Sequence, residues 1–193
     1  MLTNHFEIKI SLRDGFNYTL ASQWKLYQTS LEWRERFLYS LVQCTVPFYK
    51  WVGKPKQSKW NITIEDLGEY PRHSLGRAWY NFYQGKPFSI SEHYEEHDIY
   101  HTLLGYKTTI VEETRMYCFL LGSGKISFPT LFTIIIGVVF LPEFILQFYK
   151  DYRLGKKALN ISKWDFRYLL REKRSTLQRM IFRKGKATQV PLL

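Results

Sequence analysis

Apolar side chains recur at helical spacing in the first quarter of the chain. Between about Leu20 and Cys44 their spacing is mostly three, four or seven positions, which places them on one side of a helix. Charged residues between them can face solvent, so the pattern predicts an amphipathic helix. We expect Pro47 to end this helix and Lys50 to Asn61, rich in lysine, glycine and proline, to form a loop. The apolar positions are Leu20, Trp24, Tyr27, Leu31, Leu38, Leu41 and Val42.

Capping residues and helix breakers mark the helices of the middle of the chain. A short helix around Ile64 to Glu69 should stop before a proline, and Ser74 can cap another helix through about Tyr83. Ser89-Ile-Ser-Glu92 and Thr109-Ile-Val-Glu112 both have the spacing of a capping box. We expect the first box to open a helix that ends at Leu104 and the second to open a helix that reaches about Leu121, each followed by glycine.

The next segment is strongly apolar. Residues Ile126 to Pro142 are 17 positions without a charge, whereas a membrane-spanning helix needs about 20. We expect a buried central helix here, running from about Thr130 to Leu159 with a kink near Pro142, or a helix whose apolar face meets lipid or a lipid-like ligand. A single membrane span is the third alternative.

The end of the chain is polar and basic. Ser162 can cap a final helix through Lys173 or beyond, and the last ten residues are expected to be frayed. The pattern contains no internal repeat and no strand-turn-strand signal. It predicts an all-α, single-domain helical bundle over residues 1–193, with a long, apolar, proline-kinked central helix.

Composition narrows the class of protein. A chain of 193 residues has room for one domain, and its 18% aromatic content fits large apolar surfaces in a core or an interface. Two cysteines, Cys44 and Cys118, cannot build a disulfide scaffold or a four-thiolate zinc site. Charges at Glu7, Arg13 and Asp14 interrupt any apolar run, so the N-terminus is not expected to be a secretory signal.

Positive charge is concentrated in the C-terminal segment 150–193. This segment has 13 Lys and Arg against 3 Asp and Glu, whereas the rest of the chain has 15 basic and 14 acidic groups. Such a segment either is a solvated tail or attracts nucleic acid, an acidic partner or an anionic membrane. Because no nucleic-acid recognition motif accompanies it, nucleic acid is not an expected partner.

One group of residues has the pattern of a metal site. His97 and His101 lie four positions apart, so a helix projects both imidazoles from one face. Asp98 can reach a metal at the edge of that helix or orient a histidine. Glu113 lies in the first turn of the next capped helix, and its carboxylate meets the histidines if the chain folds back at Gly105. Two histidines with one or two carboxylates leave coordination positions open for substrate or water.

Each of these residues also has an ordinary interpretation. A histidine pair on a helix is commonly surface decoration, and the nearby acidic residues can simply solvate the helix. His93 is either a further ligand or a surface or packed histidine. The residue after His97 is Asp rather than the Glu of a metalloprotease, so a protease is not favoured. The acidic neighbours are Glu92, Glu95, Glu96 and Glu112.

The spacing of the four candidate ligands resembles a known signature. His97, Asp98, His101 and, after 11 intervening residues, Glu113 reproduce the H-D-x-x-H-x11-E signature of the coenzyme Q biosynthesis protein four family. Glu112 departs from the glycine common before that Glu. Three further segments resemble that family. Leu104-Gly105-Tyr106-Lys107-Thr108 resembles its L-x-G-Y-x-T turn, without the residue between Leu and Gly. Tyr70 to Tyr80 resembles its proline-x-x-small-Leu-Gly-x-x-aromatic segment, and Trp164 to Arg171 resembles its terminal helix, which runs from a tryptophan to an arginine.

The resemblance implies an α-helical protein at a membrane surface that acts in ubiquinone (coenzyme Q) or prenylquinone synthesis. The family that carries the signature is associated with a divalent metal, usually zinc, and with a long isoprenoid-tailed ring precursor. Members of this family are regarded both as organisers of the biosynthetic complex and as catalysts of oxidative decarboxylation, a lyase-type activity. Carried over, His97, Asp98, His101 and Glu113 would hold the metal.

The expected partners and location follow from the same resemblance. They are the lipid precursor, other quinone-biosynthesis enzymes, the membrane surface and a second copy in a homodimer, at the cytoplasmic face in a bacterium or the matrix side of the inner mitochondrial membrane in a eukaryote. Aromatic side chains and the apolar segment would line a site for the tail, or simply pack a core. Two other functions stay open: a non-catalytic lipid-binding scaffold with a structural metal, and a metal-dependent hydrolase with His97 and His101 as ligands.

Overall fold

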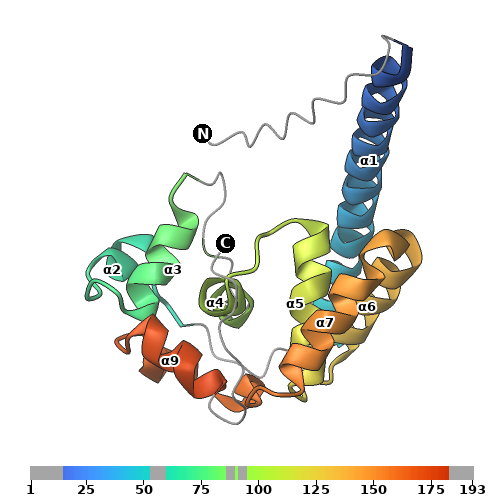
Figure 1. Ribbon diagram of the computed structural model, residues 1–193. Helices are drawn as coiled ribbons and strands as arrows, with labels where there is room; N and C mark the ends of the chain where they lie inside the picture. The colour runs from blue at the N-terminus through green and yellow to red at the C-terminus, as the bar shows by residue number, and fades with distance from the viewer. Residues whose placement is uncertain (1–14, 53–59, 86–89, 91–94, 183–193) are drawn as a thin grey trace.

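The structure is a computed structural model that describes residues 15–52, 60–85, 90 and 95–182 (Figure 1). Over these residues the chain forms helices and no strand, which confirms the all-α prediction; one isolated antiparallel bridge joins Ser74 to Lys173. The helices are α1 (Gly15–Val52), α2 (Ile64–Gly68), α3 (Leu75–Tyr83), α4 (Glu95–Leu104), α5 (Ile110–Gly122), α6 (Phe128–Phe140), η1 (Pro142–Phe144), α7 (Ile145–Gly155), η2 (Ile161–Lys163), α8 (Phe166–Leu169) and α9 (Arg174–Ile181).

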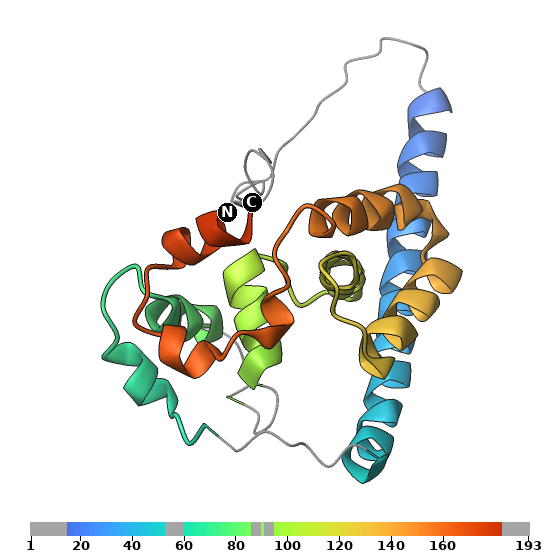
Figure 2. The same ribbon diagram turned by 90° about the horizontal axis from the view of Figure 1, so that it is seen from below.

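Two apolar clusters hold the helices together, and α5 contributes to both. One side of α5 packs Met116 and Phe119 against α3, α4, α8 and α9, and the other side packs Val111 and Cys118 against α1, α6 and α7. In Figure 1, and again in the view from below in Figure 2, α2, α3 and α9 accordingly lie on one side of the molecule, α1, α6 and α7 lie on the other, and α4 and α5 lie between. Burial on both sides fixes α5, which also supplies one of the candidate ligands.

Helix α1 is longer than the sequence predicts. It continues through Pro47 to Val52, so the expectation that Pro47 ends the helix is wrong. A proline inside a helix removes one backbone donor and bends the chain, but the hydrogen bonds on either side can carry the helix past it. The predicted loop therefore begins later than Lys50, and residues 53–59 lie outside the described part of the chain.

Helices α3 and α5 begin where their capping residues predict, and α2 begins at the predicted Ile64 with a cap, Thr63, that sequence reasoning did not identify. The side chains of Thr63, Ser74 and Thr109 each accept a hydrogen bond from a backbone N–H of the first turn. Helix α4 ends at Leu104, and Gly105 follows with φ of +84°, as the sequence predicts. The Ser89–Glu92 box lies outside the described residues.

The apolar segment is two helices rather than one kinked helix, so that prediction is wrong. Helices α6 and α7 meet at an angle of 105° on either side of η1. The backbone N–H of Leu141 still donates to Gly137, but Pro142 has no N–H to continue the ladder, and α7 starts again at Ile145. No single helix in the described part of the chain is both long and apolar enough to cross a membrane; α6 and the segment from Pro142 to Gly155 reach that length and composition only as a bent pair.

The final predicted helix is also divided. Asn160, not Ser162, accepts the capping hydrogen bond of η2; Asp165 caps the short α8, and α9 starts at Arg174. The chain bends here because the backbone N–H groups of Leu75 and Gly76 donate to the carbonyls of Glu172 and Leu170, at 2.8 Å each. The predicted frayed end, 183–193, lies outside the described residues.

Close backbone contact sets the position of α7 against α5. A Cβ on Gly155 would lie 2.0 Å from the carbonyl oxygen of Phe119, and a Cβ on Gly122 would lie 2.1 Å from that of Tyr152. Both distances are far below van der Waals contact, so only glycine lets the two helix backbones approach this closely. This approach brings Asp151 of α7 beside Arg115 of α5, at 2.7 Å between Oδ2 and Nε.

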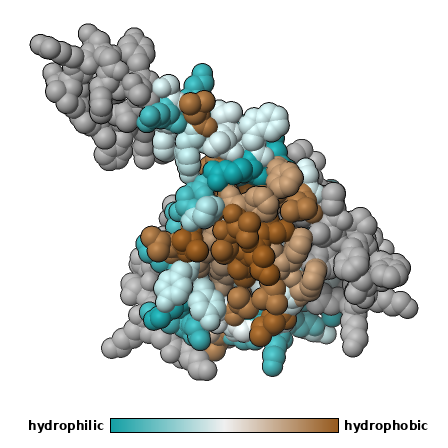
Figure 3. Space-filling model, turned by 90° about the vertical axis from the view of Figure 1, so that its right-hand side faces the viewer, coloured by the Kyte–Doolittle hydropathy of each residue, from teal (hydrophilic) through white to brown (hydrophobic). Residues whose placement is uncertain are grey.

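Helix α6 buries small residues together with Ile136 on its inner side and exposes several large apolar residues on its outer side. Thr130, Thr133 and Gly137 are buried, and Gly137 lies against the side chain of Thr114 of α5. The opposite side carries four large residues at spacings of three and four, which we call the α6 apolar face; Figure 3 shows apolar side chains gathered on this side of the molecule. The α6 apolar face comprises Phe128, Leu131, Ile135 and Val139, which are 58%, 41%, 63% and 63% exposed.

Candidate metal centre

Two histidines of α4 lie side by side, as their spacing predicts. The ring centroids of His97 and His101 are 4.7 Å apart, with the rings near perpendicular. His101 is 2% exposed, whereas the side chain of His97 is 30% exposed. One imidazole is therefore held inside the protein, while the other reaches the surface.

Glu113 of α5 completes a group of three candidate ligands. Its Oε2 lies 3.2 Å from Nε2 of His97, and its Oε1 lies 2.8 Å from Nε2 of His101. One ligand atom from each residue can be chosen so that all three lie within 4.8 Å of one another. The structure therefore brings together on one point a carboxylate and two imidazoles from two helices.

The orientation of His101 fits a metal ion. Its Nδ1 lies 3.0 Å from the carbonyl oxygen of Tyr106, so we assign a proton to Nδ1, which leaves Nε2 as the nitrogen that can bind a metal. No described group completes a hydrogen bond with this buried Nε2, although the carboxylate of Glu113 lies close to it. A lone pair and a carboxylate that face each other in a buried site repel unless a proton or a metal ion lies between them. The residues present therefore fit a divalent metal.

The fourth expected ligand is placed differently. Asp98 accepts a hydrogen bond from the hydroxyl of Tyr83, and its Oδ1 lies 3.6 Å from Nδ1 of His97. The carboxylate thus adjoins the nitrogen of His97 that faces away from Glu113, which is the position of a group that orients a metal-binding imidazole. Asp98 stands outside the group of three, and His93 lies outside the described residues.

The other carboxylates near the site have partners of their own. Glu95 is buried and accepts a hydrogen bond from the backbone N–H of Trp60 at 3.3 Å. The side chain of Glu112 accepts a hydrogen bond from Arg115 at 2.6 Å. Glu112, which replaces the glycine common in the related signature, therefore points away from the histidines. Of the two neighbouring glutamates, Glu113 faces the site.

The charges of the three residues support one another. Burial lowers the pKa of His97, but the adjacent carboxylates of Asp98 and Glu113 outweigh burial and raise that pKa to about 9. Burial raises the pKa of Glu113, but the imidazoles of His101 and His97 outweigh it and lower that pKa to about 2. At neutral pH the metal-free site thus holds an ionised carboxylate and a protonated His97.

Sequence reasoning did not identify the residues that support this site. Phe82 stacks on the ring of His101, with centroids 5.8 Å apart, and Tyr83 donates to Asp98. In the sequence, Tyr106 is only part of a turn motif, and Asp151 is only one of the three acidic residues in the basic C-terminal segment. These residues become visible only when α3 and α7 are placed against α4 and α5.

Comparison with known proteins gives a distant structural likeness. No protein-family model and no curated protein matches the chain. Among solved structures, the chain is similar to the crystal structure of a Nostoc punctiforme protein described as a candidate for ubiquinone biosynthesis, with 16% identity and a TM-score of 0.48 over 86% of this chain and 92% of that one. We therefore infer the function from this chain's own side chains and its motifs.

Proposed function

We propose that this chain is a metal-binding protein of ubiquinone or prenylquinone synthesis that binds an isoprenoid-tailed ring precursor. The observation that carries the proposal is the convergence of His97, His101 and Glu113, in the order and spacing of the H-D-x-x-H-x11-E signature. Two imidazole nitrogens and one carboxylate suit zinc and leave a position for substrate, so zinc is the ion we expect. Asp98 is the proposed fourth residue of the metal site. It either binds the metal directly or orients the imidazole of His97.

The proposed activity is exchange of the ring carboxylate of the precursor for a hydroxyl. A bound metal supplies Lewis acidity toward the hydroxyl and carboxylate oxygens of the head group. Phe82 covers one face of His101 and keeps water from it, and the Tyr83–Asp98 hydrogen bond steadies Asp98 beside His97. With water as the oxygen source, the exchange of the ionised carboxylate releases carbon dioxide, one proton and two electrons, so it requires a two-electron acceptor from outside the chain.

Metal binding should depend on pH because His97 must lose a proton. With its metal-free pKa raised to about 9, we expect metal affinity to rise by roughly tenfold per pH unit from pH 7 to about pH 9 and then level off. Calorimetry at pH 7 in buffers of different ionisation enthalpy should show about one proton released per metal bound. A His97→Gln variant should lose this slope, and a wild type with no slope and no proton release would contradict the assignment.

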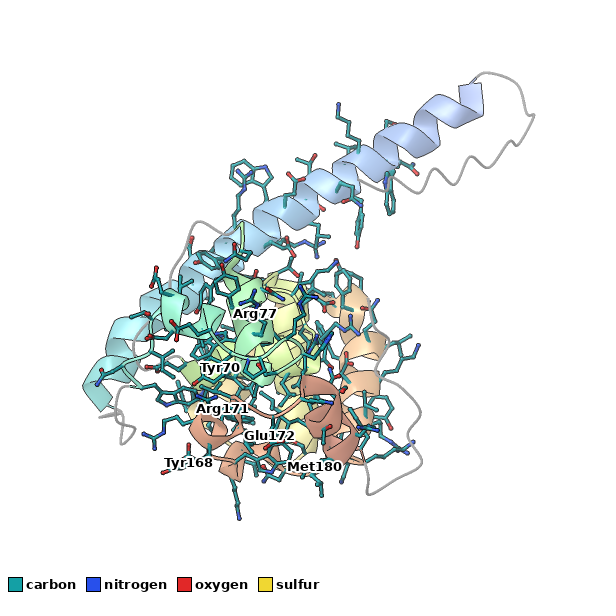
Figure 4. The ribbon with its side chains drawn as sticks, turned by 90° about the vertical axis from the view of Figure 1, so that its left-hand side faces the viewer. Tyr70, Arg77, Tyr168, Arg171, Glu172 and Met180 are labelled. Atoms are coloured by element: carbon teal, nitrogen blue, oxygen red, sulfur yellow. The ribbon has the colours of Figure 1, made fainter. Side chains whose placement is uncertain are left out.

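Replacing Glu113 with glutamine tests the enzyme. The amide keeps the shape of the side chain but removes the charge that faces both imidazoles. We expect Glu113→Gln to lose conversion of a tailed 4-hydroxybenzoate-type precursor by at least about a hundredfold, given the loss of a charged ligand at a catalytic metal. The matched control is Glu172→Gln, an exposed carboxylate outside the group of three, on the side of the molecule shown in Figure 4. Full conversion by Glu113→Gln, or by metal-free wild type, removes the enzyme proposal.

A second candidate is a non-catalytic lipid-binding scaffold with a structural metal. The outward-facing α6 apolar face favours it, and α7 continues the apolar surface with Ile145 and Leu146, both exposed. The exposed basic side chains of Lys150 and Arg153 lie on the same helix, where they can meet anionic head groups. Under this candidate Glu113→Gln binds lipid normally and the wild type shows no turnover.

Both candidates place the protein at a membrane surface. We propose peripheral attachment through the α6 apolar face, on the cytoplasmic side in a bacterium or the matrix side of the inner mitochondrial membrane in a eukaryote. Other quinone-biosynthesis enzymes and a second copy of this chain are the proposed protein partners.

A further inference from the structure

A chain of contacts connects His101 to a buried carboxylate 50 residues away along the chain. The carbonyl oxygen of Tyr106 faces Nδ1 of His101 at 3.0 Å, and the hydroxyl of the same tyrosine donates to Oδ1 of Asp151 at 2.9 Å. Asp151 belongs to α7 and is 6% exposed. One tyrosine therefore contacts the candidate ligand through its backbone and the carboxylate through its side chain.

The backbone of Tyr106 is not fixed by a helix. Tyr106 lies just after Gly105, in the connection between α4 and α5. The side chain supplies the fixed points: its hydroxyl is held by Asp151, its ring packs on Phe119 at 6.5 Å between centroids, and the guanidinium of Arg115 lies 5.6 Å from the ring centroid. The direction of the Tyr106 carbonyl, and with it the ring of His101, depends on these contacts.

Asp151 also holds the helix that carries the other ligand. Its Oδ2 accepts a hydrogen bond from Nε of Arg115 at 2.7 Å, and Nη1 of Arg115 donates to Glu112 at 2.6 Å. Glu112 precedes Glu113 in the first turn of α5. One buried carboxylate is thus bonded both to the segment that orients His101 and to the helix that presents Glu113.

We infer that Asp151, acting through the hydroxyl of Tyr106, is a positioning residue that keeps Nε2 of His101 directed at the metal. This inference rests on the proposed metal function and adds to it a residue of α7 outside the signature. Groups that orient metal-binding histidines typically change metal affinity by about 10–100-fold when they are removed. We expect the contribution of Asp151 to metal affinity to fall in that range. Asp151 acts on His101 only through Tyr106, but it also holds α5 through Arg115.

Two small substitutions test the inference. Tyr106→Phe removes only the hydroxyl, and Asp151→Asn keeps the shape but cannot serve Tyr106 and Arg115 as an ionised carboxylate does. We expect each to weaken Zn²⁺ or Co²⁺ binding, measured by competition with a chelator, by roughly 10–100-fold. Because both act on one path, the double variant should lose little more than the larger single loss.

The matched control breaks a similar ion pair that does not lead to the site. Glu143 of η1 accepts from Arg34 of α1 at 2.6 Å, so Glu143→Gln makes the same chemical change as Asp151→Asn. It should leave metal affinity and the visible spectrum of the Co²⁺-loaded protein unchanged, whereas both site variants should alter that spectrum. Wild-type affinity and spectrum in Tyr106→Phe and Asp151→Asn, with only a lower unfolding midpoint, would overturn the inference and leave the proposed function standing.

A measurement without metal separates the two possible failures. In the metal-free wild type, nitrogen–proton NMR correlations of the imidazole should show a proton on Nδ1 of His101 that exchanges slowly with water because the carbonyl of Tyr106 accepts its hydrogen bond. Both variants should lose this protection from exchange. If the wild type takes up no metal, the proposed function fails. Wild-type protection of the Nδ1 proton in both variants overturns the positioning role, whatever the metal result.

Discussion

Replacing His101 with alanine is expected to abolish stoichiometric metal binding. The wild type should retain about one metal per chain on purification, and the variant should lose at least about a hundredfold in affinity, because a direct ligand contributes more than the 10–100-fold of the groups that orient it. Elemental analysis of the purified proteins measures the first quantity, and chelator competition measures the second. Metal at 100 times its Kd should stabilise the wild type by about 2.7 kcal/mol and leave the variant unchanged.

Burial of His101 requires a control for the fold. Ile99 lies on the same helix and is fully buried, so Ile99→Ala should cost about 2–5 kcal/mol in unfolding free energy but keep the metal. If the His101 variant is too unstable to purify, His97→Ala provides the same test with a more exposed side chain. Equal metal content in wild type, His97→Ala and His101→Ala would remove the metal site.

Two aspartates on the α6 apolar face are expected to prevent attachment to lipid vesicles. Ile135 and Val139 are each 63% exposed and lie one turn apart. Burying such a side chain in an apolar phase is worth up to about 1.5–3 kcal/mol, so Ile135→Asp with Val139→Asp should weaken binding by at least about a hundredfold. Co-sedimentation with vesicles that contain phosphatidylglycerol measures the loss of binding. The wild type should bind more weakly to neutral vesicles or at high salt, because Lys150 and Arg153 then contribute less.

The opposite face of the molecule supplies the control for this experiment. Tyr168 and Met180 lie on the side shown in Figure 4, away from α6, and are 80% and 42% exposed. Aspartate at both positions changes charge and apolar surface by a similar amount. Loss of vesicle binding in both double variants, or in neither, would remove the proposed role of the α6 apolar face.

The sequence predicts an element well where the signal is local. The start of α3 at Ser74, the start of α5 at Thr109 and the turn at Gly105 depend on hydrogen bonds or φ values within a few residues, and all three are found as predicted. The same locality holds for the pair His97 and His101, because helical geometry alone places them on one face.

Two predictions about the effect of proline are wrong. Pro47 was expected to stop α1, which continues to Val52, and Pro142 was expected to kink one helix that the structure divides into two at 105°. A proline removes the same donor in both places. In the second, α6 and α7 each pack on α5, through Gly137 and Gly155, and these two contacts are consistent with the sharp bend. No feature of the local sequence near Pro142 specifies that angle.

Sequence alone determined that this chain is helical, where several helices begin, and which residues have the spacing of a metal signature, because each of these depends on neighbours within about four positions or on a linear pattern. Tertiary structure decided that Glu113 meets both histidines, that Asp98 stands aside with Tyr83, and that Asp151 holds Tyr106. It also turned Phe128, Leu131, Ile135 and Val139 of α6 outward. These outcomes depend on which helices come into contact, and such contact is set by close packing between residues far apart in the chain, such as Gly155 against Phe119.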